Sequence, residues 1–446
     1  MNRRTLIIAT LVLGTTAGAG LWAAQRFGSR ESPVSDRSFL LASASAATTL
    51  ERENRDQQIA FFEKRAREDP FSAGDRAQLA YLFLQRARET GSYQDVLRAE
   101  EAARTSLALR TAHNTSTYLL LSASLLEQHR FREANEAARL LFESDPENPG
   151  YRAHLGETQM ELGDYDAARV TFGSLEPARK SLDVAPALAR WEEIVGRTGE
   201  ARLLLEAARD QAVKRSDLNR EQVAWFHLRV GDLELRNGRL KQAERALRAG
   251  LELNPGDYRL LAAMARLEAV RGRWNQAVEY GNDAIAVAFD PNTVGLIAEA
   301  QAALGDSAAA REYLVAMDVA TSSRDEPFHR PYGLFLLDHG RRIPEVAAKA
   351  AEEIETRRDV YGYDLLAWAL HKQGRHAEAK AAMDSALRMG TQDALLFFHA
   401  GMIARALGDN AAARQHLRKA LAINPYFHPT HPRLARATLK SLPKGS

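Results

Sequence analysis

A glycine at a helix-ending turn recurs about every 34 positions, and this spacing constrains the fold of the chain more than any other feature. Glycine suits such a turn because it adopts the left-handed backbone without the strain that a Cβ would add. A period of this size indicates short helices that stack in an array, each unit packing against its neighbours. The recurring glycines are Gly163, Gly196, Gly238, Gly272, Gly305, Gly340, Gly374 and Gly408.

The residue types around each turn glycine recur with it. Small residues stand seven positions earlier, where they let two helices approach closely; they are Gly156, Gly231, Ala265, Ala298, Ala367 and Gly401. An Asp or Asn followed by Pro closes several units, because proline disfavours continuation of a helix; these pairs begin at Asp145, Asn254, Asp290 and Asn424. In this combination of residues the chain resembles the tetratricopeptide repeat (TPR) family, over roughly residues 75–426.

The resemblance implies an all-α fold, an α-solenoid of roughly ten stacked antiparallel helix pairs wound into a superhelix. The interval between Gly196 and Gly238 is longer than the others, which predicts an extended helix or loop at residues 211–219. We therefore expect an N-terminal arm at residues 50–215, a C-terminal arm at residues 216–427, and a C-terminal tail at residues 428–446.

The N-terminus has the pattern of an export signal. Arg3 and Arg4 precede an apolar run over residues 6–24, which predicts a signal peptide or a retained membrane anchor within residues 1–28. An ordinary buried helix is the third interpretation. Residues 29–49 are rich in Ser and Ala and are predicted to be a flexible linker. The protein is thus expected to be periplasmic or extracytoplasmic, secreted or anchored by its N-terminal segment.

Composition excludes several kinds of chemistry. The chain has no cysteine, which excludes disulfides and cysteine-ligated metals. Its 60 basic and 58 acidic residues are interspersed, so nucleic acid is not an expected partner. We find no phosphate-binding loop or catalytic motif, and we assign no catalytic, cofactor or metal site. His428 and His431 flank Pro429 and are interpreted as part of an extended tail. For them to hold a metal, a third ligand would be needed, with His399 and His416 as candidates.

The family resemblance places the first helix of each unit on the concave face of the superhelix. By register, this groove would present ten candidate partner-binding residues: Tyr361, Asp364, Trp368, His371, Phe398, His399, Met402, Arg405, Arg259 and Arg266. Aromatic and Arg side chains are typical binding anchors, but Trp368 and Phe398 are equally suited to pack between repeats. The Lys and Asn set with which some members of the family clamp C-terminal carboxylates is not found.

Three functions follow from this pattern. The first is a non-enzymatic scaffold of the cell envelope that binds a protein or peptide partner in the concave groove. The second is an accessory or assembly subunit of a membrane transport, secretion or metal-handling complex. The third is an enzyme whose carboxylates or histidines gather across repeats.

Overall fold

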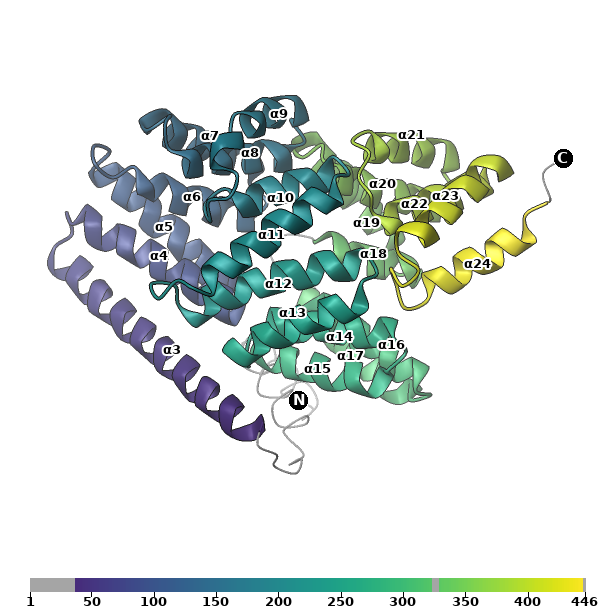
Figure 1. Cartoon of the computed structure of the whole chain (residues 1–446), viewed down its shortest axis with the longest axis horizontal. Coiled ribbons are helices and arrows are strands. Elements are labelled where there is room, and N and C mark those ends of the chain that lie inside the picture. The colour runs from purple at the N-terminus through teal and green to yellow at the C-terminus, as the bar shows by residue number, and fades with distance from the viewer. Residues whose placement is uncertain (1–36, 323–328, 444–446) are drawn as a thin grey trace, which may run out of the picture.

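The computed structural model describes residues 37–322 and 329–443, which form twenty-two α-helices and no strand (Figure 1). Twenty of these helices form ten antiparallel pairs, and successive pairs stack side by side. The predicted solenoid of helix pairs is confirmed. The pairs are α4 (Ala73–Thr90) with α5 (Tyr93–Leu109), α6 (Ser116–Glu127) with α7 (Phe131–Ser144), α8 (Pro149–Leu162) with α9 (Tyr165–Gly173), α10 (Ala185–Ile194) with α11 (Thr198–Ala212), α12 (Arg220–Arg236) with α13 (Leu240–Leu253), α14 (Tyr258–Val270) with α15 (Trp274–Val287), α16 (Pro291–Ala303) with α17 (Ser307–Thr321), α18 (Arg330–Asp338) with α19 (Ile343–Thr356), α20 (Val360–Lys372) with α21 (His376–Leu387), and α22 (Ala394–Ala406) with α23 (Asn410–Ile423).

The small residues before each turn act as predicted. A Cβ on Gly156 of α8 would lie 2.9 Å from the ring of Phe172 in α9. A Cβ on Gly401 of α22 would lie 2.7 Å from Leu417 in α23. Both positions therefore require glycine because a large side chain of the partner helix fills the space against the backbone.

A long helix, α3 (Arg37–Glu68), precedes the first pair. It covers residues 37–49, so the flexible linker predicted there is wrong for these residues. Alanine is the strongest helix former, and Ala44 and Thr48 are buried against the rest of the fold. The predicted signal peptide or anchor at residues 1–28 lies outside the described residues. Within the described part of the chain, no helix has both the length and the apolarity needed to cross a membrane.

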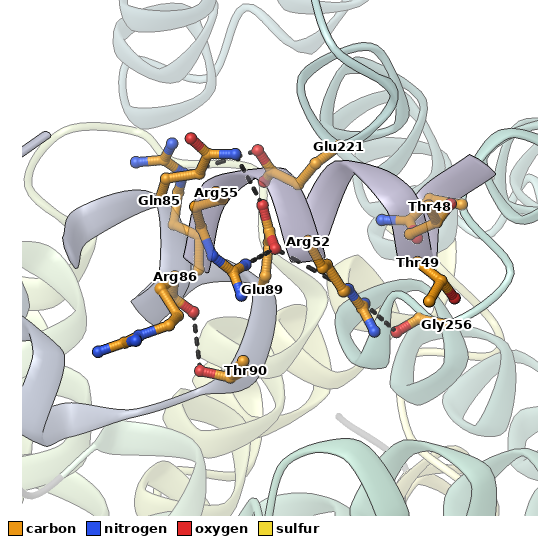
Figure 2. Close-up of polar contacts among 12 residues, drawn as sticks. Thr48, Thr49, Arg52, Arg55, Gln85, Arg86, Glu89, Thr90, Glu221 and Gly256 are labelled. Atoms are coloured by element: carbon orange, nitrogen blue, oxygen red, sulfur yellow. Dashed lines mark hydrogen bonds and ion pairs between the residues drawn. The ribbon is translucent and has the colours of Figure 1, made fainter. Parts of the chain in front are cut away.

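Polar contacts fix α3 against distant parts of the array (Figure 2). The Arg55 guanidinium forms a buried ion pair with Glu89 of α4, and Gln85 donates to the same carboxylate at 2.9 Å. One turn earlier, Arg52 donates to the carbonyl oxygen of Gly256, in the loop between α13 and α14, at 3.3 Å. Helix α3 therefore joins the first pair to the loop before the sixth.

The array winds into a superhelix whose second turn lies directly against the first. The backbone N–H of Arg358, before α20, donates to the carbonyl oxygen of Leu162 in α8 at 3.0 Å. The Thr391 hydroxyl, before α22, donates to the carbonyl oxygen of Ile194 in α10 at 2.6 Å. In each case the turn inside one helix pair meets the loop that precedes another pair, six pairs later in the array. We call these contacts the inter-turn seam; on the first turn they are made at or beside Gly91, His129, Gly163, Gly196 and Gly238.

The seam is close enough to exclude side chains. Gly196 has a φ of 80°, and a Cβ on it would lie 2.3 Å from the carbonyl oxygen of Gly390. In the second pair a histidine takes the place of glycine: His129 has a φ of 57°, and its ring centroid lies 4.8 Å from that of His329. The turn glycines Gly272, Gly305, Gly340, Gly374 and Gly408 have no such neighbour within 4 Å.

The structure modifies the predicted domain boundaries in two ways. The loop at residues 213–219 lies where we expected it, but one apolar core continues across it from Ala208 of α11 to Phe226 and Leu233 of α12. The two predicted arms are thus packed as one body. The predicted tail at residues 428–446 contains a further helix, α24 (His431–Ser441), which packs on α23.

Candidate functional site

Four of the ten predicted groove residues are buried between the last two helix pairs. Asp364, Phe398 and His399 have no exposed surface, and Trp368 is 3% exposed. They come from the inner helices α20 and α22, which face each other across neighbouring repeats. Their placement on an open groove is therefore wrong, because adjacent inner helices need large side chains to fill the space between them.

A closed polar network explains how Asp364 tolerates burial. Its carboxylate pairs with Arg330 of α18 and lies 2.7 Å from Nδ1 of His399. Burial alone would raise the pKa of Asp364, but His399 and Arg330 outweigh it and hold that pKa below its ordinary value. The ring of Trp368 stacks on those of His371 and His399, with centroids 4.9 and 4.2 Å away.

Three other predicted residues are occupied by contacts within the chain. Arg405 is exposed and donates to the Thr438 hydroxyl of α24 at 3.3 Å, and Met402 also contacts this hydroxyl. Arg259 pairs with Asp257 at 2.7 Å and with Glu221 at 2.8 Å. Binding of a partner by these residues stays a prediction.

Of the last three predicted residues, His371 stacks on Trp368, whereas Tyr361 and Arg266 line a cavity of about 510 Å³ on the inside of the superhelix. Inner helices of seven pairs reach this cavity, together with the loops between them. Its charged, polar and aromatic lining is Glu127, His129, Phe131, Glu157, Glu161, Arg190, Arg236, Arg266, His329, Arg330, Glu353, Arg357, Tyr361 and Asp393.

The ring of Tyr361 is in contact with two guanidinium groups in this cavity. Arg190 of α10 and Arg330 of α18 lie 5.1 and 4.9 Å from the centre of its ring, on opposite turns of the superhelix. Both distances are within the range of a cation–π interaction. Burial raises the pKa of Tyr361 even though Arg190 acts in the opposite sense, so its hydroxyl is a neutral donor at pH 7.

Most charges around the cavity are paired, yet several remain accessible. Arg357 lies 3.0 Å from Glu161, and Arg266 lies 2.8 Å from Asp232. The side chain of Arg266 is still 54% exposed. Burial lowers the pKa of His329 to about 4, with His129 adding to the effect, so His329 is neutral at pH 7.

A second cavity of about 300 Å³ adjoins the first. The two share Arg236, Arg266, Arg330 and Asp393 in their linings, so they lie next to each other, and we call them together the inner channel. The second cavity is more apolar and extends towards α24. Its far end is formed by Leu395, Tyr426, Phe427, His428, Pro429 and Asp338.

The two C-terminal histidines lie beside the end of this channel. The ring centroids of His428 and His431 are 3.8 Å apart, and the carboxylate of Asp338 completes a group of three potential metal ligands. The third metal ligand that we expected from the sequence, His399 or His416, is wrong. His399 is instead paired with Asp364, and His416 stacks on Phe397.

Comparison with known proteins agrees with this architecture. Family models described as tetratricopeptide repeat match residues 125–190, 224–267 and 365–426. The chain is a tetratricopeptide repeat protein. No curated protein has a significantly similar sequence.

Several solved TPR structures resemble this chain at low identity. PilW, a type IV pilus biogenesis factor, is 17% identical, with a TM-score of 0.40 over 50% of this chain and 99% of its own. PilF of Pseudomonas aeruginosa is also 17% identical, with a TM-score of 0.38 over 50% of this chain and 97% of its own. The APC/C hetero-tetramer Cut9–Hcn1 is 14% identical, with a TM-score of 0.33 over 92% of this chain and 97% of its own. Likenesses at this level carry no information about partners.

The TPR register also shows which channel residues our sequence analysis missed. Arg266, which we predicted, stands six positions before its turn glycine, and Arg190 holds the same position in its own repeat. Extending this single offset along the chain identifies a series of inner residues with alternating charge: Glu157, Arg190, Asp232, Arg266 and Glu299. No repeat offset identifies Arg357, because it lies in a loop that only the inter-turn seam brings to the channel.

Proposed function

We propose that this TPR protein is a non-catalytic scaffold that binds an extended segment of another protein in its inner channel. The observation that carries the proposal is the convergence of exposed and half-exposed charged side chains with Tyr361 on two joined cavities. Their volumes, about 510 and 300 Å³, are in the range of ligand-binding pockets. A folded domain is disfavoured as the ligand, because the inter-turn seam closes the side of the superhelix.

The charges of the channel favour a polypeptide over nucleic acid. Arginines and acidic residues alternate along it, so its potential does not have one sign as a phosphate backbone requires. An extended peptide suits this surface because its backbone and mixed side chains can exchange hydrogen bonds with both signs of charge. Tyr361 and Arg330 supply the kind of aromatic and Arg contacts that commonly anchor partners.

The same pairing argues against a role in proton transfer for Glu353 of this channel. Glu161 and Glu353 are held by Arg357, and burial would raise the pKa of Glu353 if His129 and Arg357 did not outweigh it. A carboxylate held ionised by a fixed cation is a poor proton donor near neutral pH. We therefore assign Glu353 to structure and recognition.

The test is selection of peptides followed by a matched pair of charge reversals. Arg266→Glu alters the channel, while Arg139→Glu alters an arginine of α7 that is equally 54% exposed, is also paired with an acid, and lines neither cavity. Peptides enriched from a random library should bind Arg266→Glu at least tenfold more weakly and bind Arg139→Glu normally. Failure to enrich any peptide, or equal affinities for both variants, contradicts the proposal.

We further propose that this scaffold acts outside the cytoplasm, exported by residues 1–28. The basic and apolar pattern of that segment supports this location. A reporter fused after Thr49 should be exported. A variant in which Arg3 and Arg4 are substituted, and which also carries Leu11→Asp and Leu13→Asp, should retain the reporter in the cytoplasm. Mass measurement of the mature N-terminus distinguishes a cleaved signal from an anchor.

A further inference from the structure

We propose that His428, His431 and Asp338 bind one divalent transition-metal ion, with zinc as the reference ion, and that this ion ties the C-terminal helix to the inner channel. The three residues come from different parts of the fold. Asp338 ends α18, His428 lies in the loop after α23, and His431 begins α24. Their ligand atoms all lie within 4.8 Å of one another.

The strongest indication is an unsatisfied imidazole nitrogen. His431 is only 7% exposed, and its Nε2 has no hydrogen-bond partner. This atom nevertheless lies 3.1 Å from Oδ2 of Asp338, in a direction unsuited to a hydrogen bond. Buried polar atoms are rarely left unpaired. An ion between the nitrogen lone pair and the carboxylate oxygen would satisfy both.

The surrounding hydrogen bonds prepare the imidazole of His431 to act as a ligand. The Thr430 hydroxyl oxygen lies 3.1 Å from Nδ1 of His428 and 3.2 Å from Nδ1 of His431. This oxygen can accept a hydrogen bond from Nδ1 of His431, which leaves Nε2 of His431 unprotonated. Such an outer hydrogen bond is the usual way in which proteins fix the tautomer of a metal-binding histidine. Nδ1 of His428 is instead an acceptor, because the backbone N–H of Thr430 donates to it at 3.2 Å.

The carboxylate is oriented in the same way. The indole Nε1 of Trp368 donates to Oδ1 of Asp338 at 2.8 Å, and the Lys372 ammonium lies 3.9 Å from the same oxygen. Both contacts use Oδ1, so Oδ2 faces His431. Asp338 is therefore positioned by a buried aromatic residue that the sequence had suggested as a binding anchor.

The donor set identifies the class of ion. Two imidazole nitrogens and one carboxylate oxygen suit zinc and its first-row neighbours, whereas Mg²⁺ and Ca²⁺ prefer oxygen ligands only. Ligands on a tetrahedral zinc lie about 3.4 Å apart, so the longest separation here has to shorten by about 1.4 Å. The half-buried ring of His428 has to turn inwards for this, away from its contacts with Thr430. His428 and Asp338 also line the 300 Å³ cavity, which gives the ion an entry path and room for water as a fourth ligand.

The experiment uses the purified chain, stripped with a chelator and titrated with Zn²⁺ by calorimetry and with Co²⁺ by visible absorption. We expect one equivalent to bind, a tetrahedral Co²⁺ spectrum, and a higher melting temperature with Zn²⁺. His428→Gln should weaken binding at least tenfold and abolish the thermal shift. His416 is a second half-buried histidine, remote from the cluster. The control variant His416→Gln should bind Zn²⁺ as the original chain does.

Asp338→Asn provides a second test, because it preserves the size of the side chain and its bond from Trp368 while removing the charge. It should also weaken Zn²⁺ binding at least tenfold in a protein of unchanged helicity. Absence of binding by the original chain overturns the proposal. One-equivalent binding that persists unchanged in both variants overturns it as well.

Discussion

At the scale of single residues, buried histidines make the stability of the fold depend on pH. His227 of α12 is 8% exposed, and its Nδ1 has no hydrogen-bond partner. Burial lowers its pKa to about 4, and the nearby Arg209 adds to this effect while Asp210 opposes it. Because the folded pKa lies below the ordinary value of about 6.5, the unfolded chain binds this proton first. The stability contributed by neutral His227 is therefore complete above pH 6.5 and is lost as the pH falls towards 4.

This relation predicts a specific difference between two proteins. From pH 8 to pH 5, His227 alone should cost the folded state roughly 2 kcal/mol, and His227→Gln should remove that part of the pH dependence. Denaturant unfolding of both proteins at both pH values measures the difference. If the original chain and His227→Gln lose the same stability between pH 8 and pH 5, then the imidazole of His227 is not buried in the neutral state.

The helix on which a residue lies could be predicted from the sequence more readily than the residues that surround it. The repeat register correctly assigned Trp368, His399 and Asp364 to the inner helices, but their register position did not show that all three are buried. An inner TPR helix contacts both neighbouring repeats, so one of its faces packs and another lines the channel. A polar residue such as Asp364 looks like a surface group unless its partner, Arg330, is known to lie beside it.

At the scale of secondary-structure elements, the docking of α3 depends on one buried ion pair. Arg55 and Glu89 are 4% and 7% exposed, and the other acid in contact with Arg55, Asp56, has a half-exposed side chain. Removing one member of a buried pair leaves an uncompensated charge, whereas an exposed pair contributes little.

Glu89→Ala should therefore destabilise the protein by roughly 3 kcal/mol. Glu68→Ala, which breaks an exposed pair with Lys64 on the same helix, should cost less than about 1 kcal/mol. Hydrogen exchange should show faster opening of α3 in the first variant only. If both variants unfold like the original chain, then α3 is not held in place by Arg55.

The first helix also shows where composition misleads. A segment rich in Ser and Ala resembles a linker, yet alanine is an excellent helix former once the segment has a surface to pack against. The surface that buries Ala44 and Thr48 belongs to a distant part of the chain, since Arg52 reaches Gly256. Local sequence contains no information about that contact.

At the scale of the whole molecule, the central feature is the inter-turn seam, which turns an open solenoid into a closed superhelix around a channel. Sequence predicted the helix pairs and the left-handed glycine that ends most of the inner helices. It did not predict which glycines touch the next superhelical turn, because Gly196 and Gly374 occupy identical positions in their repeats. The difference arises from small rotations between successive repeats, which accumulate along the array until the first turn meets the second.

A comparison of Gly196→Ala with Gly374→Ala tests the closed superhelix most directly. The two glycines have φ values of 80° and 79°, so both variants suffer the same backbone strain, about 1–2 kcal/mol. Only Gly196 faces another turn, where the new Cβ would lie 2.3 Å from the carbonyl oxygen of Gly390. The closed superhelix predicts that Gly196→Ala lowers the free energy of unfolding by about 2 kcal/mol more than Gly374→Ala. Equal losses in the two variants would contradict the seam and, with it, the enclosed channel.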